Sequence, residues 1–206
     1  LGVDSMIPGI PGPVFVPDAY PTTTTDPLVA DTDGDGLLDG EEDANANGLF
    51  EGDRGPMFLD ETDPLNPDTD ADGLTDGDEG MVDLDGDGIL DPLEPDIDDD
   101  GVIDGDEGPL GTDRYDADSD DDGLLDGDER DVHLTDPAVS DTDSDGLFDG
   151  LELGFSSVTN PHTDMTLVQL DNDPSTMTDP HNPDTDGDTL LDGDEDLDHD
   201  GRYDRM

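Results

Sequence analysis

Residues 118–129 read DSDDDGLLDGDE, and this twelve-residue stretch contains the pattern that organises the whole chain. Its key acids stand at positions 1, 3, 5, 9 and 12, and a glycine stands at position 6. Carboxylates with this spacing turn toward one point when the chain bends sharply, and a glycine at the bend has no side chain to hinder it. We therefore expect residues 118–129 to form a loop that wraps around a cation.

The same pattern recurs along the 206-residue chain, which makes it an internal repeat. Complete copies occupy residues 31–42, 68–79, 83–94, 96–107, 118–129 and 141–152. Residues 184–195 keep every acid but have Thr189 at position 6, and two degenerate copies begin at Asp43 and Asp196. Of the 63 acidic residues, 41 occupy the five acidic positions of these nine segments, so the repeat organises the charge.

The ligand types favour calcium over other metals. Carboxylates at positions 1, 3 and 5, a backbone carbonyl at position 7, position 9 directly or through water, and a bidentate Glu at position 12 form a shell of seven oxygens. Such a shell suits Ca²⁺ better than the smaller Mg²⁺, which requires octahedral geometry. With no Cys and only four His, a zinc or iron site is not expected. We predict multiple Ca²⁺ ions, about nine, one for each segment.

The predicted metal ligands are the acids and amides at positions 1, 3, 5, 9 and 12 of the nine segments. They are Asp31, Asp33, Asp35, Asp39 and Glu42; Asp43, Asn45, Asn47 and Glu51; Asp68, Asp70, Asp72, Asp76 and Glu79; Asp83, Asp85, Asp87, Asp91 and Glu94; Asp96, Asp98, Asp100, Asp104 and Glu107; Asp118, Asp120, Asp122, Asp126 and Glu129; Asp141, Asp143, Asp145, Asp149 and Glu152; Asp184, Asp186, Asp188, Asp192 and Glu195; and Asp196, Asp198, Asp200 and Asp204.

The composition excludes several classes of protein. Five basic residues against 63 acids give a formal net charge of −58, which is incompatible with a basic nucleic-acid binder or a polybasic membrane-surface protein. Leu, Ile, Val and Phe make up about a fifth of the chain, too few for a conventional core at this charge. Apolar pairs at positions 7 and 8 are enough only for local clusters. We predict a mostly irregular, elongated, calcium-stapled tandem repeat array with few short strands and no continuous hydrophobic core.

The repeats divide the chain into four predicted segments. Residues 1–24 form a Pro/Gly-rich apolar N-terminal arm, which is either a flexible, polyproline-like leader or an arm that docks on another subunit as a strand. Residues 25–152 form the calcium-binding repeat array. Residues 153–177 form a connector with one possible strand, Met165 to Leu170, and residues 178–206 hold the C-terminal calcium-binding repeats.

A short motif precedes five of the loops by a constant distance. T-D-P stands at residues 25–27, 62–64, 135–137 and 178–180, with T-D-R at 112–114 as a variant, and its Asp always lies five residues before the first loop Asp. With these motifs, residues 25–206 resemble thrombospondin type-3 calcium repeats in their cysteine-free bacterial form. The resemblance implies a chain wrapped around a string of calcium ions with little regular secondary structure, serving as an extracellular spacer or adhesion segment. An EF-hand or dockerin is disfavoured, because no helix is expected after Glu42 or Glu107.

Two loops and the C-terminus depart from the pattern. Arg54 removes the closing carboxylate of the second loop, where Asp53 is a candidate substitute, and Thr189 is expected to strain the turn of the eighth. The last loop reaches position 11 at Met206. Either the terminal carboxylate or a neighbouring chain completes it, and a head-to-tail contact of that kind would build a filament.

The predicted role is that of a secreted, cell-surface calcium-binding structural protein, either a rigid spacer or a self-associating filament subunit. If the protein is secreted, its leader has already been removed. We expect no enzyme, because His133, His162, His181 and His199 stand apart without a nucleophile partner. The expected partners are calcium and further copies of the chain, with no nucleic acid and no membrane insertion. The alternatives are a disordered acidic calcium buffer or mineral-nucleating protein, and a stalk fragment of a larger adhesin.

Overall fold

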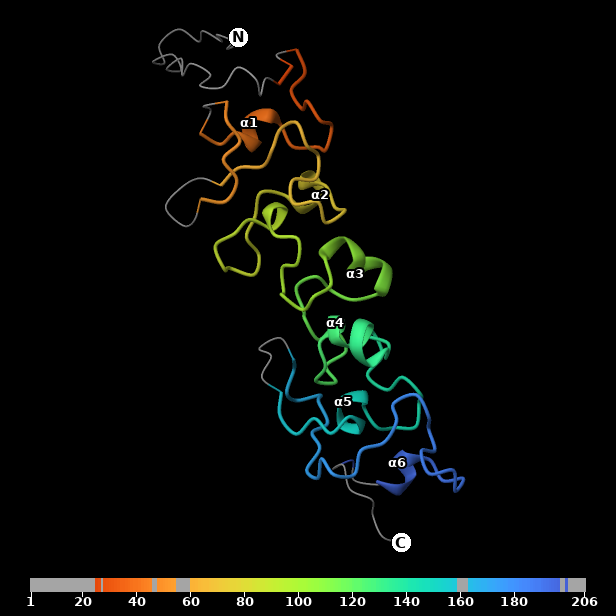
Figure 1. The fold of residues 1–206 in the computed structure, drawn as a ribbon. Helices are drawn as coiled ribbons and strands as arrows, with labels where there is room; N and C mark the ends of the chain where they lie inside the picture. The colour runs from red at the N-terminus through yellow and green to blue at the C-terminus, as the bar shows by residue number, and fades with distance from the viewer. Residues whose placement is uncertain are drawn as a thin grey trace. The chain divides into compact units, whose positions relative to one another are not determined.

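The computed structural model describes residues 25–26, 28–45, 48–54, 60–158, 163–196 and 199. The chain divides into two compact units, Leu1–Pro95 and Asp96–Met206. The first unit contains the single-turn helices α1 (Asp39–Glu42) and α2 (Asp76–Glu79) and the 3-10 turn η1 (Asp91–Leu93). The second contains α3 (Asp104–Leu110), α4 (Asp126–Asp128), the π-helical turn η2 (Glu129–His133), α5 (Asp149–Glu152) and α6 (Asp192–Glu195) (Figure 1).

The expectation of a mostly irregular, loop-rich fold is confirmed, but the expected strands are absent from the described residues. The nearest feature there is an isolated antiparallel bridge between Asp113 and Asp116. The predicted strand Met165–Leu170 is wrong, because this segment begins with a turn. Asp164 produces the turn: its carboxylate accepts the amide and the hydroxyl of Thr166 at 2.9 and 2.8 Å, and its carbonyl accepts the amide of Leu167.

Every helix except η2 begins at position 9 of a loop. The preceding residue is extended, as at Leu125 with φ −91° and ψ 142°, and the acids that follow lie in the first helical turn, where the helix dipole favours negative charge. The expectation that nothing helical follows position 12 is wrong in the second unit, since α3 continues to Leu110 and η2 continues from α4. Gly111 ends α3 with a left-handed φ of 97°.

Seven of the nine loops are closed at their base by contacts between the beginning of the loop and position 9. The amide of Asp149 donates to the carbonyl of Ser140, the residue before the loop, at 3.0 Å. The carboxylate of Asp149 accepts the amide and the hydroxyl of Thr142, at position 2, at 2.9 and 2.7 Å. A position-2 amide contact of this kind recurs at Thr32–Asp39, Thr69–Asp76, Leu84–Asp91, Ile97–Asp104, Ser119–Asp126 and Thr185–Asp192.

The T-D-P motif joins the end of one loop to the start of the next. The hydroxyl of Thr135 donates to Glu129 Oε1 at 2.9 Å, at the end of the preceding loop. The amide of Asp136 donates to the hydroxyl of Thr142 at 3.0 Å, at the start of the following loop. The threonine contact recurs at Thr62–Glu42 and Thr178–Glu152. The motif is therefore a clasp between consecutive loops.

Position 5 of one loop also contacts position 10 of a later loop. The amide of Gly127 donates to Asp100 Oδ2 at 3.2 Å. The same link joins Gly77 to Asp35, Gly150 to Asp122 and Gly193 to Asp145. A Cβ atom on any of these four glycines would overlap the backbone carbonyl oxygen of its aspartate, so the close approach requires glycine.

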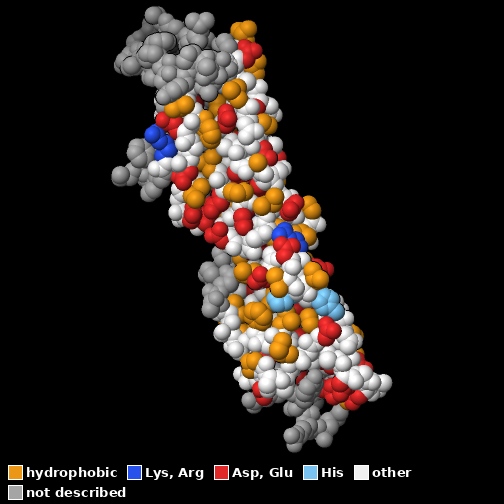
Figure 2. Space-filling view, viewed as in Figure 1, with side chains coloured by type: hydrophobic (Ala, Val, Ile, Leu, Met, Phe, Trp, Pro, Cys, Tyr) orange, Lys and Arg blue, Asp and Glu red, His pale blue; other side chains and the backbone are white. Residues whose placement is uncertain are grey.

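The interior contains more acids than apolar side chains. In the described part of the chain the buried apolar residues are Ile97, Val102, Ala117, Leu124, Leu147 and Leu151, with the prolines Pro92, Pro137 and Pro180. The apolar pair at positions 7 and 8 is divided, because Val102 at position 7 is 1% exposed whereas Ile103 at position 8 is 37% exposed. On the viewed face, acidic side chains are mixed with apolar ones and basic side chains form only small spots (Figure 2). The small number of buried apolar side chains fits the expectation, from the composition, of local apolar clusters.

Candidate metal centres

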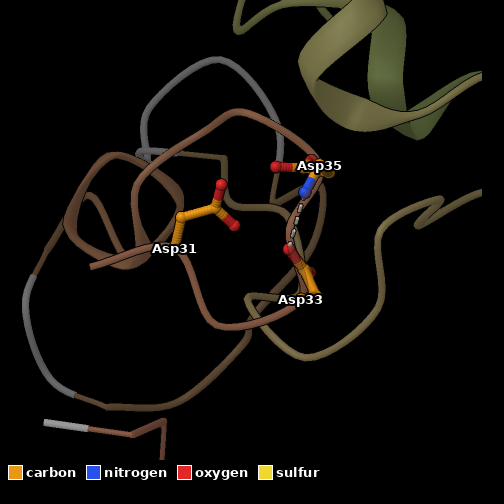
Figure 3. A group of neighbouring side chains, drawn as sticks. All are labelled: Asp31, Asp33 and Asp35. Atoms are coloured by element: carbon orange, nitrogen blue, oxygen red, sulfur yellow. Dashed lines mark hydrogen bonds between the residues drawn. The ribbon is translucent and has the colours of Figure 1, made fainter. Parts of the chain in front are cut away.

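The carboxylates at positions 1, 3 and 5 are held close together by the backbone of their own loop. Asp31, Asp33 and Asp35 each offer an oxygen within 4.8 Å of the others, and their carboxylates face the space inside the loop (Figure 3). Backbone amides hold these carboxylates in place: Gly34 and Gly36 donate to the two oxygens of Asp31, Asp35 donates to one oxygen of Asp33, and Leu37 and Gly77 donate to the two oxygens of Asp35. The triads Asp68–Asp70–Asp72 and Asp83–Asp85–Asp87 gather in the same way. The structure therefore brings these predicted ligands together.

At position 3, one carboxylate oxygen accepts a backbone hydrogen bond and the other has no hydrogen-bond partner among the described residues. Asp120 Oδ1 accepts the amide of Asp122 at 3.2 Å, while Asp120 Oδ2 is buried without a hydrogen-bond partner among the described residues. The same holds for the Oδ2 atoms of Asp33, Asp70, Asp98 and Asp143. Since buried polar atoms are normally paired, the unpartnered oxygens at the same position of five loops are candidate cation ligands.

The glutamates at position 12 repeat this arrangement. Glu129 is fully buried; its Oε1 accepts the Thr135 hydroxyl, and its Oε2 is without a partner in the part of the chain that the structure describes. Glu42 and Glu152 behave alike, each with a threonine on Oε1 and an orphan Oε2. Glu107 is 1% exposed, and both of its oxygens are buried with no partner in the described segments.

Burial and crowding of these acids raise their pKa values. Burial first, and then the charges of Asp33 and Asp35, raises the pKa of Glu42 from 4.5 to about 8. With burial again the largest cause and the neighbouring aspartates contributing, the pKa is about 9 for Glu107, about 10 for Glu129 and about 9 for Glu152. These groups carry a proton at neutral pH unless a cation replaces it.

The pKa values of the position-3 aspartates are raised in the same way. Burial and then the charge of Asp122 raise the pKa of Asp120 from 3.8 to about 8. Burial followed by the position-5 neighbour raises the pKa to about 6 for Asp70, about 7 for Asp98 and about 6 for Asp143. Positions 3, 5 and 12 thus converge on one crowded, negatively charged space in each of these loops.

Position 9 serves mainly in loop closure, a role that the spacing alone did not predict. Both carboxylate oxygens of Asp76 accept hydrogen bonds from Thr69, at 2.7 and 2.6 Å. Asp76 also offers an oxygen within 4.8 Å of ligand atoms of Asp35 and Glu42, in an earlier loop. Asp76 therefore closes the base of its own loop and also lies beside the candidate metal site of loop 31–42.

The loops differ in the exposure of their acids and in the strain of their backbone. Asp83, Asp85 and Asp87 are exposed, and Pro92 at position 10 of that loop has no amide to donate. Thr189 adopts a left-handed φ of 86°, where a β-branched residue is strained, as expected. Asn47, Asp198, Asp200 and Asp204 lie outside the described residues, as do residues 1–24 and Met206.

Sequence reasoning missed two sets of residues that build these centres. One is the position-10 glycines, which recur in the pattern D-G-x-E and were readable from that recurrence. The other is Glu61, which belongs to no twelve-residue copy but lies fully buried beside Asn45. The substitute suggested by spacing, Asp53, is exposed.

No known protein family, curated protein or solved structure matches this chain. Among the described residues, no helix is long and apolar enough to cross a membrane. The function must therefore be argued from the loops themselves.

Proposed function

We propose that this chain is an extracellular structural protein whose loops bind Ca²⁺ and are stabilised by it. The observation that carries the proposal is the row of buried carboxylate oxygens at positions 3 and 12 that have no partner within the described residues. They recur at the same positions in loop after loop, which a chance acidic surface would not produce.

A cation in each loop would resolve an electrostatic problem of the fold. Buried carboxylates without partners are costly, and here they also repel one another. Extracellular calcium modules bind with Kd values of about 10⁻⁴ to 10⁻³ M, and a tenfold excess of ligand stabilises a protein by roughly 1.4 kcal/mol per site. Several such sites together match the stability of an ordinary domain.

The donor set favours calcium over other ions. The candidate ligands are carboxylate oxygens, including a buried Glu at position 12 whose Oε2 has no partner in the described chain at Glu42, Glu129 and Glu152, as is true of both oxygens at Glu107. Several carboxylates gather in each loop, and Ca²⁺ accepts six to eight oxygen ligands in variable geometry, whereas Mg²⁺ requires a near-ideal octahedron and retains its waters. The residues present therefore fit the ion.

The test is a comparison of the intact chain in EDTA and in millimolar calcium. We expect calcium to convert an expanded ensemble into a narrowly distributed folded particle, seen by small-angle scattering, with a change in circular dichroism. Magnesium at the same concentration should produce a much smaller change. A chain that binds calcium but stays expanded would instead support the disordered acidic buffer.

We propose a spacer or filament role from the repetition of the clasp and of the link between loops. Self-association is tested by light scattering of purified chain at millimolar calcium. A particle whose mass grows with protein concentration supports a filament subunit, and a constant monomer mass supports a spacer.

A further inference from the structure

The degenerate loop 43–54 lacks an acid at the position that closes every complete loop. Arg54 occupies position 12, and its Nη1 lies 2.5 Å from Glu51 Oε2, so the arginine neutralises the position-9 acid. Position 1 is nevertheless built normally, since Asp43 Oδ2 accepts the amide of Gly48 at 2.8 Å. The loop thus has the start of a cation site and no closing carboxylate of its own.

Glu61 is placed at this gap although it lies seven residues beyond the loop. Its side chain is fully buried, and its Oε1 accepts both the backbone amide and the side-chain amide of Asn45, at 3.1 and 2.5 Å. Asn45 is position 3 of the loop, and its side-chain amide also donates to Glu51 Oε2 at 2.9 Å. Glu61 is therefore bound to the centre of the loop.

The remaining oxygen of Glu61 has the signature of a metal ligand. Glu61 Oε2 is buried and has no hydrogen-bond partner among the described residues, as at the position-12 glutamates. Burial is the largest cause of the raised pKa of Glu61. The hydrogen bond from the Asn45 amide lowers this pKa, and the charges of Asp43 and Glu51 raise it. The neighbouring Thr62 donates to Glu42 Oε1 at 3.2 Å, which fixes Glu61 against the preceding loop.

We propose that Glu61 replaces the carboxylate lost at Arg54 and completes a divalent-cation site with Asp43 and Asn45. The inference rests on the proposed calcium binding and adds to it a ligand that lies outside the twelve-residue repeat. Glu61 occupies the role that sequence spacing offered to Asp53, and it brings the charge that an amide at position 3 does not supply.

The test counts calcium ions on the intact chain by native mass spectrometry. Glu61→Gln keeps the size of the side chain and an acceptor for Asn45, and we expect it to bind one calcium ion fewer than the wild type. Asp78→Asn removes the same charge from an exposed position of the same unit and should leave the count unchanged. Asp53→Asn should also leave it unchanged.

Each outcome separates this inference from the calcium proposal. A wild type that binds no calcium defeats both. A wild type that binds several ions, with an unchanged count in Glu61→Gln or a lost ion in Asp53→Asn, overturns the inference alone. Should Glu61→Gln lose folded structure, a calcium-loaded crystal of the wild type decides, because Glu61 Oε2 is expected within about 2.3–2.6 Å of an ion.

Discussion

In several loop carboxylates the two oxygens have different partners. In Asp100, Oδ1 accepts the amide of Val102 within the loop and Oδ2 accepts the amide of Gly127 from another loop. In Asp98, Oδ1 accepts the amide of Asp100, and Oδ2 is left without a partner in the described chain. Aspartate suits these short-range contacts because its side chain reaches nearby amides. The prevalence of Asp over Glu follows from this geometry.

Glu107→Gln tests the closing ligand at the residue scale. We expect at least a tenfold loss of calcium affinity at one site, about 1.4 kcal/mol, because Gln cannot offer a charged bidentate group. The rise in Tm between EDTA and calcium, measured by calorimetry, should shrink. Asp106→Asn removes the same charge at an exposed neighbour and should leave this rise intact; an equal effect of both substitutions would assign it to net charge alone.

Thr189→Gly tests backbone strain at position 6. Threonine there has a left-handed φ of 86°, and glycine adopts this conformation without steric cost. We expect a gain of about 1 kcal/mol in the free energy of unfolding, measured by urea titration in calcium. Thr189→Ala keeps a Cβ atom and should gain much less. Equal gains from both substitutions would contradict the strain argument.

The recurring structural element is one loop followed by one helical turn. The turn places positions 9 and 12 on the same face, so Asp149 closes the loop base while Glu152 reaches the loop interior. Position 10 lies between them and faces another loop, where Gly150 meets Asp122. Helix propensity does not explain a turn of Asp, Gly and Glu; the tertiary contacts at positions 9, 10 and 12 do.

Gly127→Ala tests this contact between elements. A Cβ atom would overlap the carbonyl oxygen of Asp100, so we expect a loss of about 1–3 kcal/mol in the free energy of unfolding, read from urea titration in calcium. Gly40→Ala is the matched control, because Gly40 is also at position 10 but a Cβ there meets nothing within 4 Å. A destabilisation of similar size in both variants would show that position 10 acts through local backbone propensity.

At the scale of the whole molecule, charge takes the place of a core. The formal net charge is −58, and many of the buried side chains are acids. Self-repulsion of this size disfavours any compact state. Protons would therefore compete with a bound cation for the same buried oxygens.

The dependence on pH follows from the raised pKa values. Because the folded-state pKa values of Glu42, Glu107, Glu129 and Glu152 lie at about 8 to 10, above 4.5, the metal-free fold binds more protons than the unfolded chain between these limits. The stability that these groups contribute is present below about pH 4.5 and is lost as pH rises through about 8 to 10. Calcium affinity should instead increase as pH rises over this range, because calcium binds the deprotonated carboxylates.

Two measurements check this expectation. In EDTA, circular dichroism should show more ordered structure at about pH 5 than at about pH 9. Near neutral pH in unbuffered solution, added CaCl₂ should release protons and lower the pH, whereas NaCl at equal ionic strength should not. A metal-free chain that is more ordered at the higher pH would contradict the argument.

The sequence predicted the loop boundaries and the irregular fold because the spacing of acids and glycines acts locally. It did not predict the functions of Thr62, Gly127 or Glu61, because each depends on a contact with a residue far away in the chain. The predicted strand at Met165–Leu170 was wrong because alternating apolar residues form a stable strand only when another strand pairs with them. The side chain of Asp164 stabilises a turn there instead.

The link between position 5 and position 10 determines where this chain tolerates insertions. The same contact spans 27 residues from Asp100 to Gly127 and 48 from Asp145 to Gly193. The chain between two linked loops can thus lengthen by some twenty residues while the link is preserved. Segments such as 153–183 are therefore the natural places for genetic insertions, where new surface chemistry can be acquired without rebuilding the scaffold.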